Sequence, residues 1–215
     1  MQSPFCDIHN ETVKSCRCES YETFFIAMMT ALASKLEKLP TQAFIIPSIR
    51  DAHHFSAYPI SPFTSTVVST KITYLSEPSI FSLNGLIFGC ASTDILLHLS
   101  ACEISRGQSS RLLRLASHLL LQRSFYPLHP PASEVCYDAT LAAKYGRLDY
   151  LPHVLFVPSD LKPFMKTTNG CLVVNSGRVM KGNYGGSFAR LTIDFAQLQS
   201  SNVEDASFIG EIVRI

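Results

Sequence analysis

The spacing of apolar residues predicts an amphipathic helix near the start of the chain. Between residues 19 and 38, apolar side chains recur every three or four positions, which is the period of one helix face. These side chains are Phe25, Met28, Met29, Leu32, Leu36 and Leu39. Pro40 follows directly and ends the helical pattern. The apolar run 42–47 then enters a loop at a proline, which is typical of a buried parallel strand.

The middle of the chain carries a hairpin signal followed by two helix signals. Apolar runs flank an Asn-Gly pair at 84–85, and this predicts a β-hairpin over 79–89, because a type I′ turn needs positive φ at both central residues. The Ser-Thr-Asp run at 92–94 is typical of a helix cap and predicts a short helix through Leu99. Leucines at helical spacing predict a second helix from about 108 to 122.

The last third alternates between short apolar runs and turns. Buried strands are predicted at 153–157 and 171–174, and further strands at 187–194 and 208–215, whereas the Pro- and Ser-rich stretch 56–70 predicts a packed loop. Strands that alternate with helices, together with late strands of antiparallel type, predict an α/β fold with a mixed β-sheet. We expect one domain over residues 1–215.

Composition narrows the class of protein. The 215 residues include 18 Lys+Arg and 17 Asp+Glu, for a net charge of +1, with 47% apolar and 16% charged residues. Such a chain is too apolar to be disordered, and its charge gives no global attraction to nucleic acid or anionic lipid. Soluble domains average about 25% charged residues. The low charge here therefore indicates either that a partner covers much of the surface or that the chain is a piece of something larger.

The sequence contains no recognisable membrane span or signal peptide, and its cysteines do not suggest a disulfide framework. No run approaches the roughly 18 apolar residues of a membrane span, and residues 1–7 lack the basic and apolar regions of a signal peptide. The seven cysteines are an odd number, so we expect reduced thiols in an intracellular compartment.

One candidate metal site lies near the start of the chain. Cys6, His9, Cys16 and Cys18 carry zinc-binding side chains, in the order C-x₂-H followed by C-x-C. One residue between two cysteines makes a poor zinc knuckle, and thiols next to an apolar helix are commonly buried. We therefore favour core thiols over a zinc site here.

A second candidate site follows the predicted strand 42–47. The run Arg50-Asp51-Ala52-His53-His54 occupies the position where α/β folds place active-site residues. A carboxylate and two imidazoles could bind a metal or transfer protons. The alternative is that Arg50 pairs with a carboxylate and the histidines line a loop.

Two further features are better explained by structure than by chemistry. The glycine-rich stretch 175–186 lacks the G-x-x-x-x-G-K-[ST] order and precedes a strand, so turns and close backbone approach account for its glycines. No nucleophile elbow is present, and Cys90 and Cys171 lie in apolar strand runs, so we expect them to be inert core thiols.

Several of these segments together resemble the B-subunit family of DNA polymerase alpha. The matching motifs are Pro-Ser-Ile-Arg-Asp-Ala-His-His at 47–54, Asn-Gly at 84–85, Leu-Gln-Arg-Ser-Phe-Tyr-Pro-Leu-His-Pro-Pro at 121–131, and Asn-x-Gly-Arg-x-x-Lys-Gly-x-x-Gly-Gly-Ser-Phe-Ala-Arg at 175–190. They follow the family's order and span nearly the whole chain. The resemblance implies a degenerate calcineurin-like phosphoesterase fold, a mixed β-sheet sandwich flanked by helices. It also implies truncation at the N-terminus, without the family's OB fold and first phosphoesterase strands.

The resemblance also implies that the two-metal site of active phosphoesterases is lost. Residues 3–7 stand where G-D-x-x-D is expected, with Pro4 in place of the bridging Asp, and no G-H-x-H occurs near 175–178. Ser-Ile-Arg-Asp at 48–51 replaces G-N-H-[D/E], and an arginine has no lone pair for a cation. The remnants of the site are Asp7, Arg50, Asp51, His53, Asn175 and Gly177. We expect no catalytic residue, bound metal or cofactor.

By resemblance, the chain is a non-catalytic accessory subunit of the DNA polymerase alpha–primase complex in the nucleus. It would bind the C-terminal region of the catalytic subunit and reach primase through the complex. DNA contact is possible but indirect, no membrane partner is expected, and Arg106, Arg111 and Arg114 are expected on the solvated face of one helix. The alternatives are a metal-dependent phosphoesterase with atypical ligands, or the B subunit of another replicative polymerase.

Overall fold

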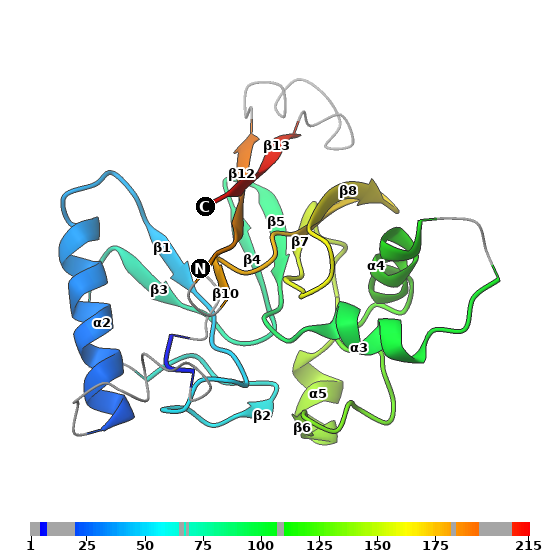
Figure 1. Ribbon diagram of the computed structural model, residues 1–215, viewed down its shortest axis with the longest axis horizontal. Coiled ribbons are helices and arrows are strands. Elements are labelled where there is room, and N and C mark those ends of the chain that lie inside the picture. Colours follow the sequence, from blue (N-terminus) through cyan, green and yellow to red (C-terminus); the bar gives the residue numbers. More distant parts are fainter. Residues whose placement is uncertain are drawn as a thin grey trace. The chain divides into compact units, whose positions relative to one another are not determined.

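The computed structural model describes residues 5–7, 20–64, 67, 69–106, 110–181, 184–193 and 208–215. Over these residues the fold is mixed α/β, with four α-helices and several β-sheets (Figure 1), which confirms the predicted class. The chain divides into two compact units. The first comprises Met1–Ser79, Cys90–Thr93 and His129–Arg147, and the second comprises Ile80–Gly89, Asp94–Leu128 and Leu148–Ile215. The single domain expected over 1–215 stays a prediction.

Helix α2 (Tyr21–Leu36) organises the core of the first unit and confirms the helix expected over 19–38. The Ser20 side chain caps its start by accepting a hydrogen bond from the Thr23 backbone N–H. Leu39 lies beyond the end of the helix and is 51% exposed, although the spacing places it on the buried face. The apolar core of this unit contains Phe25, Met29, Ala33, Leu36, Ala43, Ile45, Phe63 and Ile72.

Short parallel strands complete the first unit. β1 (Ala43–Ile45), expected as a buried parallel strand, pairs with β3 (Ile72–Tyr74), and both lie beside α2 (Figure 1). β2 (Ala57–Tyr58) pairs with β6 (Cys136–Tyr137), which leads into helix α5 (Ala139–Tyr145). The stretch 56–70 is therefore not entirely loop, because β2 forms within it. No periodicity marks a two-residue strand whose partner lies 79 positions later.

A five-stranded sheet forms the centre of the second unit, in the order β4-β5-β7-β9-β8. β7 and β9 are parallel, whereas β8 and β9 are antiparallel, so the sheet is mixed as predicted. The hairpin at 79–89 is confirmed, with φ of 49° at Asn84 and 85° at Gly85. The strand bounds are β4 Ser79–Leu83, β5 Leu86–Cys90, β7 Val154–Phe156, β8 Phe164–Thr168 and β9 Cys171–Asn175.

Helices α3 (Ile95–Cys102) and α4 (Arg111–Leu121) confirm the two helices expected after the hairpin. Asp94 caps α3 by accepting a hydrogen bond from the Leu97 N–H, at 3.0 Å. The expected solvated arginine face is wrong in two respects. Arg106 precedes α4 and is not on the helix, and the Arg114 guanidinium binds the Glu103 carboxylate at 2.8 Å, which lowers the pKa of Glu103.

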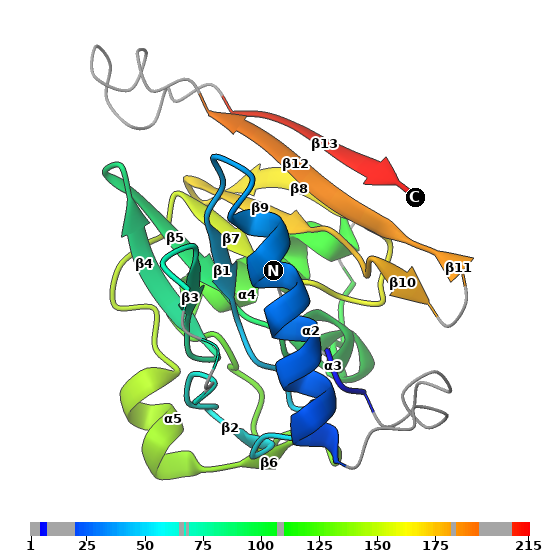
Figure 2. The same cartoon turned by 90° about the vertical axis from the view of Figure 1, so that its left-hand side faces the viewer.

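A long antiparallel ribbon covers one face of this sheet (Figure 2). The ribbon consists of β12 (Ser187–Ile193) and β13 (Phe208–Arg214), and the short pair β10 (Met180–Lys181) and β11 (Tyr184–Gly185) precedes it. Both late strands were expected from the sequence. Apolar side chains of the ribbon, Ala189, Leu191, Ile193 and Phe208, pack against a sheet cluster of Leu86, Phe88, Val154, Leu172 and Val174.

Close backbone contacts explain the glycines before this ribbon. A Cβ on Gly186 would overlap the Arg178 carbonyl oxygen, and one on Gly185 would overlap the Ile215 carbonyl oxygen. No side chain fits at these positions, so the interpretation of this stretch as close backbone approach is confirmed. Among the described residues, no helix has the length and hydrophobicity that crossing a bilayer requires.

Candidate functional site

The loop that follows β1 holds the Asp51 carboxylate in a cage of backbone N–H groups. Its Oδ1 accepts hydrogen bonds from the Phe5 N–H at 2.8 Å and the Cys6 N–H at 3.2 Å, and its Oδ2 accepts one from the Ser48 N–H at 3.1 Å. Asp51 is 2% exposed, so these bonds form away from water. The carboxylate thus joins the segment 5–7 to the loop after β1, and its oxygens are already occupied by protein donors.

Arg50 and Asp7 form an ion pair next to this cage. Asp7 pairs in antiparallel fashion with Asp51, and the Ala52 N–H donates to the Cys6 carbonyl oxygen at 2.9 Å, so the two segments lie side by side. The alternative in which Arg50 pairs with a carboxylate is therefore the correct one, and the partner is Asp7. A fixed positive charge here neutralises the carboxylate that a cation would need.

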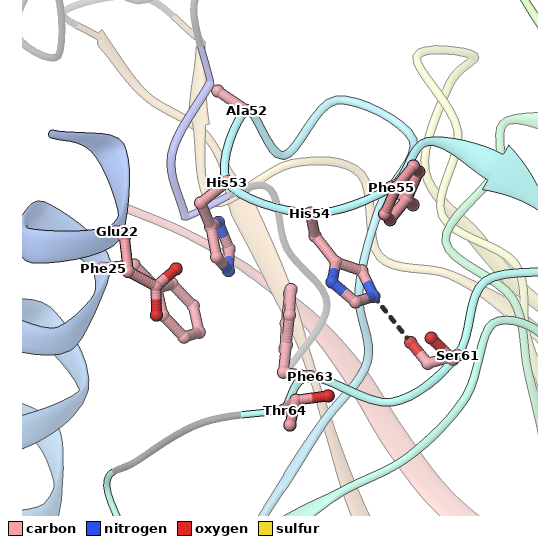
Figure 3. Close-up of a pocket in the computed structure, with 9 residues that line it drawn as sticks. All are labelled: Glu22, Phe25, Ala52, His53, His54, Phe55, Ser61, Phe63 and Thr64. Carbon is pink, nitrogen blue, oxygen red and sulfur yellow. Dashed lines mark hydrogen bonds between the residues drawn. The ribbon is translucent and has the colours of Figure 1, made fainter.

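The His53 ring packs in a triangle with the phenyl rings of Phe25 and Phe63, whose centroids are themselves 4.9 Å apart (Figure 3). Its centroid is 3.8 Å from that of Phe25 and 5.0 Å from that of Phe63, with interplanar angles of 20° and 27°. Neither ring nitrogen has a hydrogen-bond partner among the described residues. Burial lowers the pKa of His53, although the charges of Asp51 and Glu22 oppose this effect. His54 instead bonds through Nε2 to the Ser61 carbonyl oxygen at 3.0 Å.

The other two residues expected as remnants, Asn175 and Gly177, belong to the second unit and organise a loop there. The Asn175 side-chain oxygen accepts hydrogen bonds from the Ser159 N–H at 2.8 Å and the Gly177 N–H at 2.9 Å, and its amide donates to the Leu161 carbonyl oxygen at 3.2 Å. Gly177 has φ of 69°, and a Cβ there would lie 2.7 Å from the Ser187 Oγ. Both residues therefore have a structural role in shaping this loop.

Sequence reasoning missed a buried carboxyl group, Glu77. It is fully buried in the first unit, and its two oxygens accept hydrogen bonds from the Ser92 N–H at 2.6 Å and the Thr93 N–H at 2.9 Å. Burial raises its pKa to about 7, even though these hydrogen bonds favour the charged form. The feature of the sequence that could have predicted its burial is that Glu77 is the one charged residue in the stretch 72–93.

The cysteines divide into a described and an undescribed set. Cys90 and Cys171 are buried free thiols, which confirms their place in the core, and burial raises the pKa of each to about 12, which disfavours the reactive thiolate. Cys6 is buried as well, whereas His9, Cys16 and Cys18 lie outside the described residues. Within the described ranges, no cluster of three or more His, Cys, Asp or Glu could hold a metal ion.

The donor set of this site does not fit the two-metal centre of an active phosphoesterase. Asp51 accepts three backbone hydrogen bonds, Asp7 is paired with Arg50, and His53 packs against the rings of Phe25 and Phe63. A metal would have to displace Arg50 and break the contacts that hold segment 5–7. What these residues do in this structure is fix two chain segments together.

A family model for the B subunit of DNA polymerases alpha and epsilon matches residues 1–166. The chain belongs to this family. The B subunit of DNA polymerase alpha from Mus musculus is 39% identical over 99% of this chain, and the protein of the same name from Drosophila melanogaster is 37% identical over 90%. The Schizosaccharomyces pombe protein of that name is 33% identical over 88% of the chain.

The match covers a limited part of these relatives. It spans 37% of the mouse protein, 31% of the fly protein and 35% of the fission-yeast protein. The chain thus corresponds to about a third of the length of the curated relatives it matches. The family assignment agrees with the resemblance seen in the motifs at 47–54 and 121–131, both of which lie inside the matched residues.

Proposed function

We propose that this chain is a non-catalytic accessory subunit of the DNA polymerase alpha–primase complex that acts as a scaffold in the initiation of DNA replication. The observation that carries the proposal is the use of Asp7 and Asp51 as structural groups, one paired with Arg50 and the other bonded to three backbone N–H groups. Carboxylates employed in this way maintain the fold and do not hold reactive metals. The name of the curated relatives supports the same role.

In this proposal the fold is a calcineurin-like phosphoesterase fold that has lost its chemistry. A mixed central sheet covered by a second β-layer supports this ancestry, as do the glycine-rich turns around Gly177. Such a fold retains a stable core after its active site is lost, because the residues that pack its sheet differ from those that bind metal. Asp7, Arg50, Asp51, His53, Asn175 and Gly177 are then remnants of that site.

The proposed partners follow from membership in a polymerase complex. The chain would bind the C-terminal region of the DNA polymerase alpha catalytic subunit and reach primase through the complex, and it would work in the nucleus. Its low fraction of charged residues, 16%, suits a large protein–protein interface. Contact with DNA would be indirect, since the net charge of +1 provides no general attraction to phosphate.

Co-expression with the C-terminal region of the polymerase alpha catalytic subunit tests the proposal. We expect a one-to-one complex on size exclusion, with the full-length mouse relative as the positive control. Binding of the mouse protein without binding of this chain would contradict a scaffold role for these 215 residues. Selective binding to the catalytic subunit of another replicative polymerase would move the assignment to that polymerase.

The phosphoesterase alternative makes an opposite prediction for the purified chain. It requires bound Mn²⁺, Zn²⁺ or iron near stoichiometric amounts, and hydrolysis of an activated phosphodiester such as bis(p-nitrophenyl) phosphate. We expect neither, and we expect no gain of either in Arg50→His, because Asp51 remains bonded to the backbone. Metal-dependent turnover that Asp51→Asn abolishes would overturn the non-catalytic assignment.

A further inference from the structure

The first unit carries an open pocket of about 510 Å³ between the start of α2 and the loops after β1 and β2. Figure 3 shows its lining, which consists of Glu22, Phe25, Ala52, His53, His54, Phe55, Ser61, Phe63 and Thr64. The remnant residues Asp7, Arg50 and Asp51 are not among these. The pocket is therefore distinct from the degenerate site, although His53 belongs to both.

The charge of the pocket favours a cation. Glu22 provides a carboxylate, and the lining contains no lysine or arginine among the residues that the structure describes. Burial keeps the pKa of His53 below its ordinary value, so its ring adds little positive charge at neutral pH. A phosphate or a carboxylate entering this pocket would meet Glu22 without a compensating positive side chain.

The shape of the lining favours a flat cation. The rings of Phe25, His53 and Phe63 form a triangular cluster in which both phenylalanines are buried. The rings that a ligand can reach are therefore those of His53, His54 and Phe55. Phe55 is 87% exposed, so its ring is free to contact a ligand in the pocket. A guanidinium stacks on aromatic faces and forms paired hydrogen bonds with a carboxylate, whereas an ammonium group does not stack.

We propose that this pocket binds an arginine side chain presented by a segment of a partner protein. The guanidinium would pair with the Glu22 carboxylate and lie against an aromatic face, and Phe55 would fold over the aliphatic stem. This inference does not depend on the identity of the polymerase partner or on the proposed function.

A pair of matched peptides tests the proposal on the whole chain. One is an acetylated, amidated Gly-Arg-Gly peptide, and the other carries citrulline, which has the same shape without the charge. We expect the arginine peptide to shift the NMR signals of Phe55 and His53 saturably and to bind about tenfold more tightly than the citrulline peptide, as loss of a charge-assisted hydrogen bond implies. Equal affinity for both peptides, or preferential binding of adenosine monophosphate, would overturn it.

Two pairs of variants locate the binding on the pocket. Glu22→Gln should weaken binding of the arginine peptide about tenfold, while Glu37→Gln at the other end of α2 should leave it unchanged. Phe55→Ala should weaken binding of both peptides, while Leu39→Ala, an exposed apolar residue of the same unit, should affect neither. Glu22 and Phe55 are exposed, so these variants should remain folded. Full affinity in Glu22→Gln would refute the proposal.

Discussion

Arg50 pairs through its guanidinium with the carboxylate of Asp7, a residue 43 positions earlier in the chain. The Asp7 side chain is 13% exposed and that of Arg50 is 33% exposed, so the pair is partly shielded from water. A partly buried pair loses more when one partner is removed than when both are replaced, because a lone buried charge is left behind. This asymmetry can be measured.

A double-mutant cycle with Arg50→Met and Asp7→Asn gives the strength of this pair. We expect each single variant to lower the free energy of unfolding and the double variant to recover part of the loss, with a coupling of about 1 kcal/mol. Urea unfolding at low and high salt provides the measurement, and the coupling should shrink at high salt. Additive losses from the two single variants would mean that the pair contributes nothing.

Asp51→Asn should have a larger effect than either of these variants. The neutral amide has one accepting oxygen, so at least one backbone N–H group of Phe5, Cys6 or Ser48 loses its acceptor and the others lose a charged one. We expect a loss of about 2–4 kcal/mol in the free energy of unfolding, together with faster hydrogen exchange at those amides. The exposed Glu37→Gln serves as the control, and an equal change in both variants would contradict the structural role of Asp51.

Glu77 should make the first unit less stable as the pH rises. Its pKa is about 7 in the folded chain, against 4.5 when unfolded, so the folded state retains a proton that the unfolded state has lost. The stabilisation is complete below pH 4.5 and disappears as the pH rises through about 7, a change of about 3 kcal/mol. Glu77→Gln, which cannot titrate, should lack this slope in urea titrations between pH 4.5 and about 8.

His53 should affect the pH dependence of stability in the opposite direction to Glu77, so that stability rises with pH. Its pKa is lowered by burial, so below its ordinary value of 6.5 the unfolded state binds a proton that the folded state does not. Stability should therefore fall as the pH drops below 6.5, and His53→Phe should remove this fall while preserving the ring stack. An NMR titration of the His53 ring provides the direct test, and a midpoint above 6.5 would contradict the burial argument.

Gly186→Ala, compared with Gly85→Ala, tests whether Gly186 is required because a side chain has no space there. A Cβ there would overlap the Arg178 carbonyl oxygen, so the backbone at Gly186 and that at Arg178 would have to move apart. We expect a loss of about 3 kcal/mol or more. Gly85→Ala is the matched control, because it has positive φ with nothing within 4 Å, and it should lose only about 1 kcal/mol. Similar thermal shifts for both variants would argue against the close contact.

Local signals in the sequence predicted most of the elements. Helix α2, the hairpin at Asn84 and Gly85, and strands β7 and β9 each carry their own periodicity or turn chemistry. Strand β8 was missed, because its polar run Lys166-Thr167-Thr168 forms a strand only by pairing with β9 at the edge of the sheet. Helix α5 was missed as well, since its seven residues bury only Ala142.

The surroundings of Asp51 and Glu77 were only partly predictable, because they too depend on residues that are distant in the sequence. The resemblance implied that Arg50 interrupts a ligand set, but two of the three donors to Asp51 come from residues about 45 positions away. Tertiary pairing of this kind leaves no trace in local spacing. The burial of Glu77 depends likewise on the turn at 92–93 and on its backbone pairing with Ile60.

The bonds between Asp51 and segment 5–7 have a consequence for how the protein is made. A ribosome must synthesise 45 residues after Cys6 before its hydrogen-bond acceptor exists, and several more before that acceptor clears the exit tunnel. Closing a loop of this length carries an entropic penalty and delays the contact. Until then, the nascent segment has no native partner at Asp51, and a chaperone that recognises extended chain could reach it during that interval.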